Sequence, residues 1–262
     1  MNDTRFEFGK NWSEYSESVD ESRIEIAMQE LSALIPNLEG KTFLDIGSGS
    51  GIHSLAALRL GASKVVAMDY DINSVNTTKA MLSQFAPGGP WEVDQGDILN
   101  PTLTGTFDVV YSWGVLHHTG DMWQAIANAA SFCRADGEFA IALYVKTPMC
   151  GLWKKEKRLY CEYPVLRPLV RFPYTGLLLA RQTVANRSTP QTYLKDYKAG
   201  RGMDFFVDIK DWLGGYPYES VSHEELMQFL TPKGFDFVHS RNTKAGMGLF
   251  GTGCGEWVFK KG

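Results

Sequence analysis

The stretch KTFLDIGSGSG, residues 41–51, decides the fold of this chain. Its short apolar run predicts a buried strand, and the glycines at 47, 49 and 51 predict a tight turn whose backbone can approach a ligand closely. The residues that follow, HSLAALRLGA, predict a helix that ends near Gly61. A strand, a glycine-rich turn and a helix in this order indicate the first unit of a parallel α/β fold.

Strands and helices continue to alternate along the chain. A helix over 18–35 that ends at Pro36 comes first, and later helices are expected from Asp71 to about Phe85 and over 121–135. Further strands are predicted at KVVAMD (64–69), WEVDQGD (91–97), FDVVYSW (107–113) and 137–144. This alternation predicts a Rossmann-like, doubly wound sheet that is mostly parallel, with helices on both faces.

The end of the chain follows a different pattern. Ser222-x-x-Glu225 is a capping box that opens a helix, and GFDFVHSRN and GEWVFKKG predict two strands joined by a glycine-rich connection. They would add an antiparallel C-terminal hairpin to the sheet. The predicted organisation is an N-terminal helical cap (1–40), a core (41–147), an insertion after strand five that lies over the carboxyl edge of the sheet (148–220), and a closing helix and hairpin (221–262).

Composition and charge narrow the class of protein. The chain is 44% hydrophobic and 21% charged, which is typical of a globular protein and excludes a disordered or fibrous chain. It has no apolar run long enough to span a membrane, and MNDTRFEFGKNW lacks the apolar core of a signal peptide, so a cytoplasmic location is expected. The four cysteines are scattered without a CxxC pair, which predicts neither a zinc site nor a disulfide framework.

Three acidic residues are predicted at the carboxyl ends of successive strands, where parallel sheets bind their ligands. They are Asp45, Asp69 and Asp97. Each could be a helix cap or a solvated loop residue when taken alone, but their order and positions together favour a ligand site. The turn differs from the dinucleotide pattern G-x-G-x-x-G, because Ile52 stands where the third glycine would be.

Four motifs resemble those of class I S-adenosylmethionine-dependent methyltransferases: FLDIGSGSG, VVAMDYD, QGDI and FDVVYSWGVLHH. The resemblance covers about residues 40–145 and, more loosely, the final hairpin. The flanks FGKNW (8–12) and RGMDFFVDIKDWLGGYPYE (201–219) resemble a bacterial group of these enzymes. The resemblance implies S-adenosylmethionine as cofactor, with contacts from Asp45, Gly47, Ser48, Gly49, Asp69, Tyr70, Asp97, Ile98 and Trp113. An acid at position 45 suits a ligand that carries an ammonium and a sulfonium.

Two adjacent histidines, His117 and His118, follow the fourth strand and are the candidate catalytic residues. An imidazole titrates near neutrality and can deprotonate a methyl acceptor. His118 is preferred because it stands six residues after Ser112, a spacing that resembles an active-site position of related enzymes. Both could instead pack or cap, and His53, His223 and His239 are expected to be structural. No metal is expected, since no cluster of acids follows strand four.

The methyl acceptor is less well defined. O-methylation of a small metabolite is the leading hypothesis. The alternatives are methylation of a carboxylate or nitrogen on a peptide or anionic substrate, and a non-catalytic binding module.

Residues 148–201 hold eleven Lys or Arg and three acids, a balance of +8 in a chain of net charge −4. Such a segment suits an anionic small molecule, an acidic peptide or, as the weaker hypothesis, a membrane surface, whereas nucleic acid is not expected. Further pocket candidates are Trp12, Tyr15, Arg201, Asp208, Trp212, Tyr216 and Tyr218.

Overall fold

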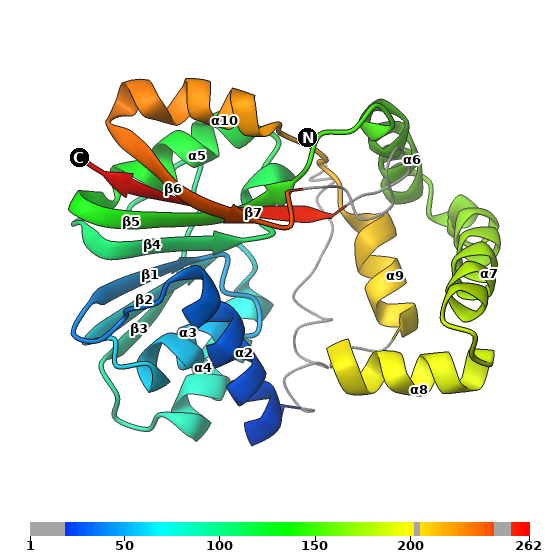
Figure 1. Ribbon diagram of the computed structural model, residues 1–262, viewed down its shortest axis with the longest axis horizontal. Helices are drawn as coiled ribbons and strands as arrows, with labels where there is room; N and C mark the ends of the chain where they lie inside the picture. The colour runs from blue at the N-terminus through cyan, green and yellow to red at the C-terminus, as the bar shows by residue number, and fades with distance from the viewer. Residues whose placement is uncertain (1–18, 202–204, 244–252) are drawn as a thin grey trace.

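The computed structural model describes residues 19–201, 205–243 and 253–262, and its centre is a seven-stranded sheet in the order β3-β2-β1-β4-β5-β7-β6 (Figure 1). Strands β1 to β5 pair in parallel, and β7 lies antiparallel between β5 and β6. The predicted Rossmann-like sheet with a C-terminal antiparallel hairpin is confirmed. The strands are β1 (Thr42–Ile46), β2 (Lys64–Asp69), β3 (Trp91–Gln95), β4 (Phe107–Trp113), β5 (Cys133–Tyr144), β6 (Phe235–Arg241) and β7 (Cys254–Lys261).

The helices that cover the sheet begin where capping residues predict. Asp20 and Asp71 accept hydrogen bonds from backbone amides at the start of their helices, and Ser222 and Glu225 form a complete capping box. Buried apolar side chains such as Ile24 and Leu31 then pack one face of each helix against the sheet. These helices are α2 (Glu21–Leu34), α3 (Ile52–Arg59), α4 (Ile72–Phe85), α5 (Met122–Ser131) and α10 (His223–Leu230), with the short η1 (Leu116–His118) and η3 (Thr231–Lys233).

The largest error in the predicted boundaries lies just before strand five. The helix expected over 121–135 ends at Ser131, and β5 begins at Cys133 instead of 137. Cys133 already pairs with Phe107, and a register shift follows in which Asp136 takes a positive φ of 61°. A short irregular start of the strand therefore replaces the last helical turn. The glycine-rich connection between β6 and β7 lies outside the described residues.

Residues 148–220, in which the sequence shows no clean period, are largely helical. The prolines that interrupt the pattern mostly lie at helix starts, where a missing amide hydrogen costs little, although Pro173 lies inside a helix. The helices share a small core around Tyr160, Phe205, Ile209 and Leu213. Figure 1 shows them beside the sheet, on the side toward which the parallel strands run. They are α6 (Cys150–Glu162), η2 (Pro164–Leu166), α7 (Arg167–Ala185), α8 (Pro190–Arg201) and α9 (Phe205–Gly214).

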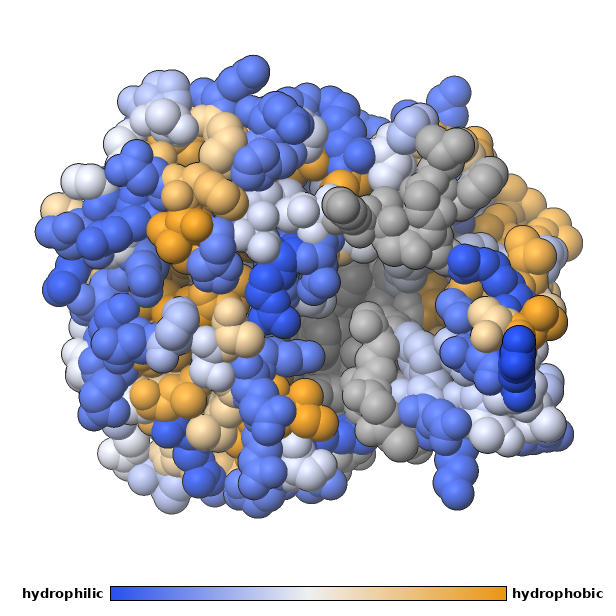
Figure 2. All heavy atoms as spheres, in the orientation of Figure 1, coloured by the Kyte–Doolittle hydropathy of each residue, from blue (hydrophilic) through white to orange (hydrophobic). Residues whose placement is uncertain are grey.

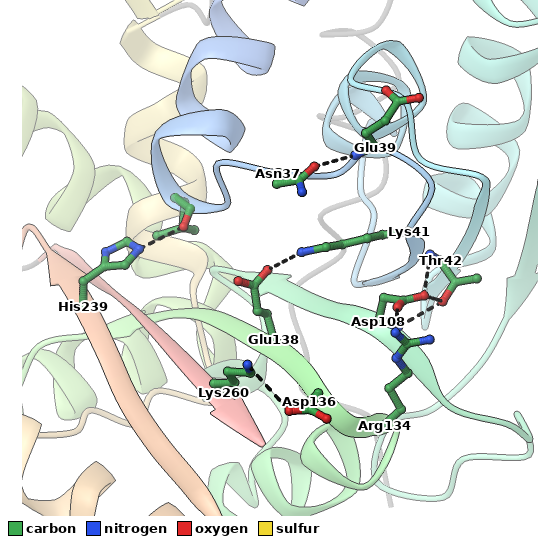
Figure 3. A network of polar contacts seen from close by, with 11 residues as sticks. Asn37, Glu39, Lys41, Thr42, Asp108, Arg134, Asp136, Glu138, His239 and Lys260 are labelled. Atoms are coloured by element: carbon green, nitrogen blue, oxygen red, sulfur yellow. Dashed lines mark hydrogen bonds and ion pairs between the residues drawn. The ribbon is translucent and has the colours of Figure 1, made fainter. Parts of the chain in front are cut away.

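The amino edge of the sheet is held by paired charges. Asp108 accepts hydrogen bonds from the amide and hydroxyl of Thr42 at 2.9 and 2.6 Å and forms an ion pair with Arg134 (Figure 3). Lys41 reaches Glu138 on β5 at 3.1 Å. These polar groups at the amino edge therefore make structural contacts.

No helix within the described ranges is both long and apolar enough to cross a membrane.

Candidate active site

The turn after β1 is held in a conformation that requires glycine. Gly47 has a φ of 79°, and its amide donates to the Met68 carbonyl at the end of β2 at 2.7 Å. A Cβ at this position would overlap the side chain of Val115, which follows β4. Gly51 has a φ of 80°, and a Cβ there would lie 2.9 Å from Thr78 of α4. The two glycines therefore let three neighbouring elements close around the turn.

Asp69 connects the tip of β2 to this turn. Its Oδ2 accepts the Gly49 amide hydrogen at 2.9 Å, and its Oδ1 accepts that of Asp71 at the start of α4, also at 2.9 Å. Burial raises the pKa of the Asp69 carboxyl, and these backbone hydrogen bonds partly oppose that shift. Ser48 contacts the same region, since its hydroxyl lies 3.0 Å from that of Thr78. The structure thus brings Ser48, Gly49 and Asp69 together, as the sequence predicts.

Asp45 is a buried carboxylate one residue before the end of β1. Its side chain is 2% exposed, and the Ser54 hydroxyl donates to Oδ2 at 2.5 Å. Burial raises the pKa of Asp45 from 3.8 to about 7; the Ser54 hydrogen bond opposes this shift and the nearby charge of Asp69 adds to it. A cation bound close by would favour the charged form of this residue. Ser54, Thr78 and Val115 are site residues that sequence reasoning missed, because each comes from the next element in space and belongs to no glycine or acid motif.

The predicted residues after β3 lie at the same edge of the sheet. The Gly96 amide donates to the Asp69 carbonyl at 2.9 Å, which holds the two strand ends together. Asp97 is half-buried, and its Oδ1 accepts the Leu99 amide hydrogen at 2.9 Å. Ile98 is buried in the main core. Asp97 is therefore at the predicted place and also closes a local turn, and its role as a ligand contact stays a prediction.

Tyr70 and Trp113 follow the neighbouring strand ends and are both exposed. Tyr70 comes directly after Asp69 and is 49% exposed, and Trp113 ends β4 and is 41% exposed. The indole Nε1 of Trp113 donates to Glu256 of β7 at 2.9 Å. These two side chains lie at the surface in the present state of the protein, and their contact with a cofactor stays a prediction.

His118 lies in η1, just past the end of β4, and its ring is held by the chain that follows α9. Its Nδ1 lies 2.7 Å from the Pro217 carbonyl, which accepts its hydrogen. Burial lowers the pKa of His118 to about 4, although the hydrogen bonds to Pro217 and Gly215 act in the opposite direction. The imidazole is therefore neutral at pH 7, as a general base must be.

His117 differs from its neighbour because it is completely buried. Its ring centroid lies 4.1 Å from that of Tyr144 and 4.3 Å from that of His118. Neither ring nitrogen has a hydrogen-bond partner among the described residues. Burial lowers the pKa of His117 well below its usual value, and the nearby charges of His118 and Lys157 lower it further. His117 has no exposed surface with which to contact a substrate, so the geometry favours His118 of the two.

The helical insertion places a buried cation beside this pair. Lys157 of α6 is fully buried, donates to the Trp212 carbonyl and lies 3.8 Å from the centroid of the Trp212 ring and 5.6 Å from that of Tyr218. Burial lowers the pKa of Lys157 to about 8, which the charge of Glu156 partly opposes. The sequence did not indicate this burial, because Lys157 is one of eleven basic residues in 148–201 and nothing in the pattern distinguishes it from the others.

Of the other predicted pocket residues, Trp212 and Tyr218 both lie beside Lys157. Tyr218 is 2% exposed, and its ring lies 5.1 Å from that of Tyr144. Tyr216 precedes Pro217, whose carbonyl holds His118. Trp12 and Tyr15 and the side chains of Arg201 and Asp208 lie outside the described part of the structure.

A pocket of about 240 Å³ opens next to Tyr218, between α5, α6 and the strand-like segment before α10. The Glu219 amide donates to the His117 carbonyl at 3.1 Å, so the wall of the pocket continues directly to the histidine pair. Lys154 and Glu219 give it both a positive and a negative wall. The lining residues are Met122, Trp123, Cys150, Lys154, Tyr218, Glu219 and Ser220.

Comparison with known proteins identifies the domain. The family described as a methyltransferase domain matches residues 44–141, which include the glycine turn and both strand-end acids, Asp45 and Asp69. Residues 44–141 therefore form a methyltransferase domain. The family predicted from the four motifs is thereby confirmed for this part of the chain, whereas the individual site residues stay predictions.

The relatives of this methyltransferase domain have diverse names. The ribosomal protein L11 methyltransferase of Shouchella clausii is 30% identical over 98 residues, which cover 36% of this chain and 31% of the relative. The tRNA U34 carboxymethyltransferase of Methylococcus capsulatus is 31% identical over 126 residues, 48% of this chain and 39% of the relative. The chain therefore spans well under half the length of these relatives.

Among solved structures, the magnesium protoporphyrin IX methyltransferase from Synechocystis PCC 6803 with bound SAH has a TM-score of 0.53 and 16% identity, over 94% of this chain and 84% of that one. At this identity the likeness shows the fold of the methyltransferase domain alone. The similarity extends across nearly the whole chain, beyond the matched residues 44–141.

Proposed function

We propose that this protein transfers a methyl group from S-adenosylmethionine to an acceptor. The observation that carries the proposal is the glycine turn 47–51, whose Gly49 amide is held by Asp69 while the buried Asp45 stands at its base. S-adenosylmethionine would supply an electrophilic methyl group on a sulfonium centre. The protein then mainly needs to align the acceptor, exclude water and, for some acceptors, remove a proton.

The residues at the turn fit this cofactor. Because Gly47 and Gly49 have no side chains, the backbone between β1 and α3 can lie close to a nucleoside. Asp69 would accept hydrogen bonds from ribose hydroxyls, and Asp97 and Ile98 would make the adenine contact. Asp45 is buried and easily protonated, so a positively charged amino acid moiety would be favoured beside its charged form. Tyr70 and Trp113 would cover the ligand from the rim.

Calorimetry of cofactor binding tests the assignment of Asp69. Asp69→Ala should weaken binding of S-adenosylmethionine about tenfold to a hundredfold, because hydrogen bonds to a charged acceptor are lost. Asp71→Ala is a matched control: it removes the cap of α4, where Asp71 accepts the Asn73 amide hydrogen at 2.8 Å, and should leave affinity nearly unchanged. Native affinity in Asp69→Ala would contradict the site.

For the acceptor, we propose the hydroxyl of a small molecule that binds in the pocket between α5 and α6, with His118 as general base. The neutral state of His118 supports this role, since its pKa of about 4 keeps the imidazole unprotonated at neutral pH. If His118 is the base, the acid limb of kcat/KM should fall near pH 4 and not near 6.5. His118→Ala should lower kcat about a hundredfold, and formation of S-adenosylhomocysteine with each of a panel of candidate acceptors gives the readout.

A second candidate is methylation of a carboxylate or nitrogen on an anionic substrate or peptide. Lys154 on the pocket wall favours it, as does the name of the L11 relative, which acts on a protein. A carboxylate acceptor hardly needs a base, so His118→Ala would then retain most of its rate while Lys154→Gln would raise KM. A nucleic acid acceptor is not proposed, although one relative is named for a tRNA. Formation of S-adenosylhomocysteine with any acceptor would contradict a purely non-catalytic binding module.

A further inference from the structure

The outer side of α7 carries apolar side chains where a surface helix normally carries polar ones. Four large side chains there are mostly exposed: Leu169 (71%), Phe172 (67%), Leu177 (73%) and Val184 (77%). Figure 2 shows hydrophobic spheres gathered at the outer edge of the molecule, where Figure 1 places α7. The outer face of α7, as we name it, consists of Leu169, Phe172, Pro173, Gly176, Leu177, Ala180 and Val184, all exposed.

The spacing of these residues follows helical periodicity, so they form one stripe along the helix. The opposite side of α7 is also apolar, but it is used: Val170, Tyr174, Leu178 and Leu179 pack on the small core of the insertion. The outer face therefore takes no part in packing the core of the insertion. The apolar surface continues past the start of the helix, where Val165 in η2 is 88% exposed. Contiguous exposed apolar surface of this kind marks an interaction site.

The charges in the segment that carries this face all have one sign. No Asp or Glu occurs between Glu162 and Asp196, whereas the same segment contains Arg167, Arg171, Arg181, Arg187 and Lys195. Arg171 lies 5.3 Å from the centroid of the Phe172 ring, so a guanidinium borders the apolar stripe directly. Arg181 and Arg187 are exposed near the other end of the helix. An occupant of this face must accept apolar side chains and carry negative charge beside them.

We infer that the outer face of α7 docks the protein on an anionic membrane surface. A convex helix with apolar side chains along its crest and arginines beside them suits the plane of the headgroup boundary, where the apolar groups insert and the cations meet lipid phosphates. A second copy of the chain is a poorer occupant, because pairing two such faces would bring their arginines together. The inference is independent of the methyl-transfer proposal, since its test requires neither cofactor nor acceptor.

Vesicle flotation tests the inference. The full-length protein should float with vesicles of phosphatidylcholine and phosphatidylglycerol in equal parts, should remain unbound with phosphatidylcholine alone, and should dissociate as salt is raised. Phe172→Gln with Leu177→Gln should weaken partitioning about tenfold or more, because two inserting side chains are lost. Ile26→Gln with Val238→Gln is the matched control: both side chains are about half exposed, at 41% and 51%, and lie on α2 and β6. This pair should bind like the native protein.

The charge requirement has a separate variant. Arg181→Gln with Arg187→Gln should weaken binding to the anionic vesicles about tenfold to thirtyfold, while thermal unfolding stays unchanged. Three results would overturn the inference: no flotation of the native protein, flotation unaffected by the Phe172 and Leu177 pair, or equal binding to neutral vesicles. Light scattering without lipid tests whether a second copy of the chain occupies this face instead. If the protein does not bind vesicles but self-associates, and Phe172→Gln with Leu177→Gln abolishes that association, the face would be assigned to a dimer.

Discussion

Asp45 of the sheet and Lys157 of the helical insertion are both buried beside the candidate active site, but in opposite ways. Asp45, at the end of β1, is a carboxylate partnered by the Ser54 hydroxyl at 2.5 Å. Lys157, on α6, is an ammonium held by the Trp212 carbonyl and by aromatic faces. Burial shifts both toward neutrality, raising the pKa of Asp45 to about 7 and lowering that of Lys157 to about 8.

This difference reflects how the two regions are built. In the sheet, backbone conformation determines the site, because parallel strand ends and a left-handed glycine turn place amides and carboxylates at set positions. In the insertion, side-chain packing determines it, since Trp153 and Tyr174 both pack on Trp212, whose ring lies beside the cation. The sheet should therefore be sensitive to backbone changes and the insertion to changes in side chains.

The largest expected effect comes from Gly47→Ala. A left-handed conformation costs an alanine about 1–2 kcal/mol, and the overlap with Val115 adds about 1–3 kcal/mol. We expect a loss of about 2–5 kcal/mol in the free energy of unfolding, measured by urea denaturation, together with loss of cofactor binding.

Gly176→Ala is the matched change in the insertion. Gly176 lies inside α7, and a Cβ there would meet nothing within 4 Å. This variant should stabilise the protein by about 0.5–1 kcal/mol, as expected for alanine in a helix. Equal destabilisation by both variants would contradict the contrast between the two regions.

The next effect concerns pH. Because the pKa of Asp45 is about 7 in the folded protein and 3.8 as a reference, the folded state binds an extra proton between these values. The contribution of Asp45 to the free energy of unfolding should be fully present below about pH 4. It should decrease by a few kcal/mol as the pH rises to 7. Asp45→Asn should flatten this part of the curve of unfolding free energy against pH. A native slope in the variant would assign the pH dependence to another group.

Lys157 should act in the alkaline range with the opposite sign and a smaller effect. Its pKa is about 8 in the folded protein and 10.5 as a reference, so the unfolded state binds more protons between these values. Stability should therefore rise as pH increases from 8 to 10.5, by about 3 kcal/mol. Lys157→Met keeps the length of the side chain and should remove that rise. An unchanged alkaline limb would mean that Lys157 is not responsible.

The sheet could be predicted closely because its signals are local. KTFLDIG and KVVAMD are apolar runs bounded by turn residues, and Asp71 and Ser222 cap the helices that they were expected to cap. The insertion could not be predicted in the same way. Its prolines interrupt the periodicity, and α7 carries apolar side chains both on the insertion core and on its outer side, so hydrophobicity alone does not reveal its orientation.

By itself, the sequence determined the alternation of strands and helices, the glycine turn and the acids at the strand ends, because each depends on residues close together in the chain. Only the tertiary structure decided which groups meet there. It placed Ser54 on Asp45, Val115 against Gly47 and the Pro217 carbonyl on His118, and it buried Lys157 while exposing Leu169 and Phe172. Burial and pKa depend on neighbours distant in sequence, and side-chain identity alone does not contain that information.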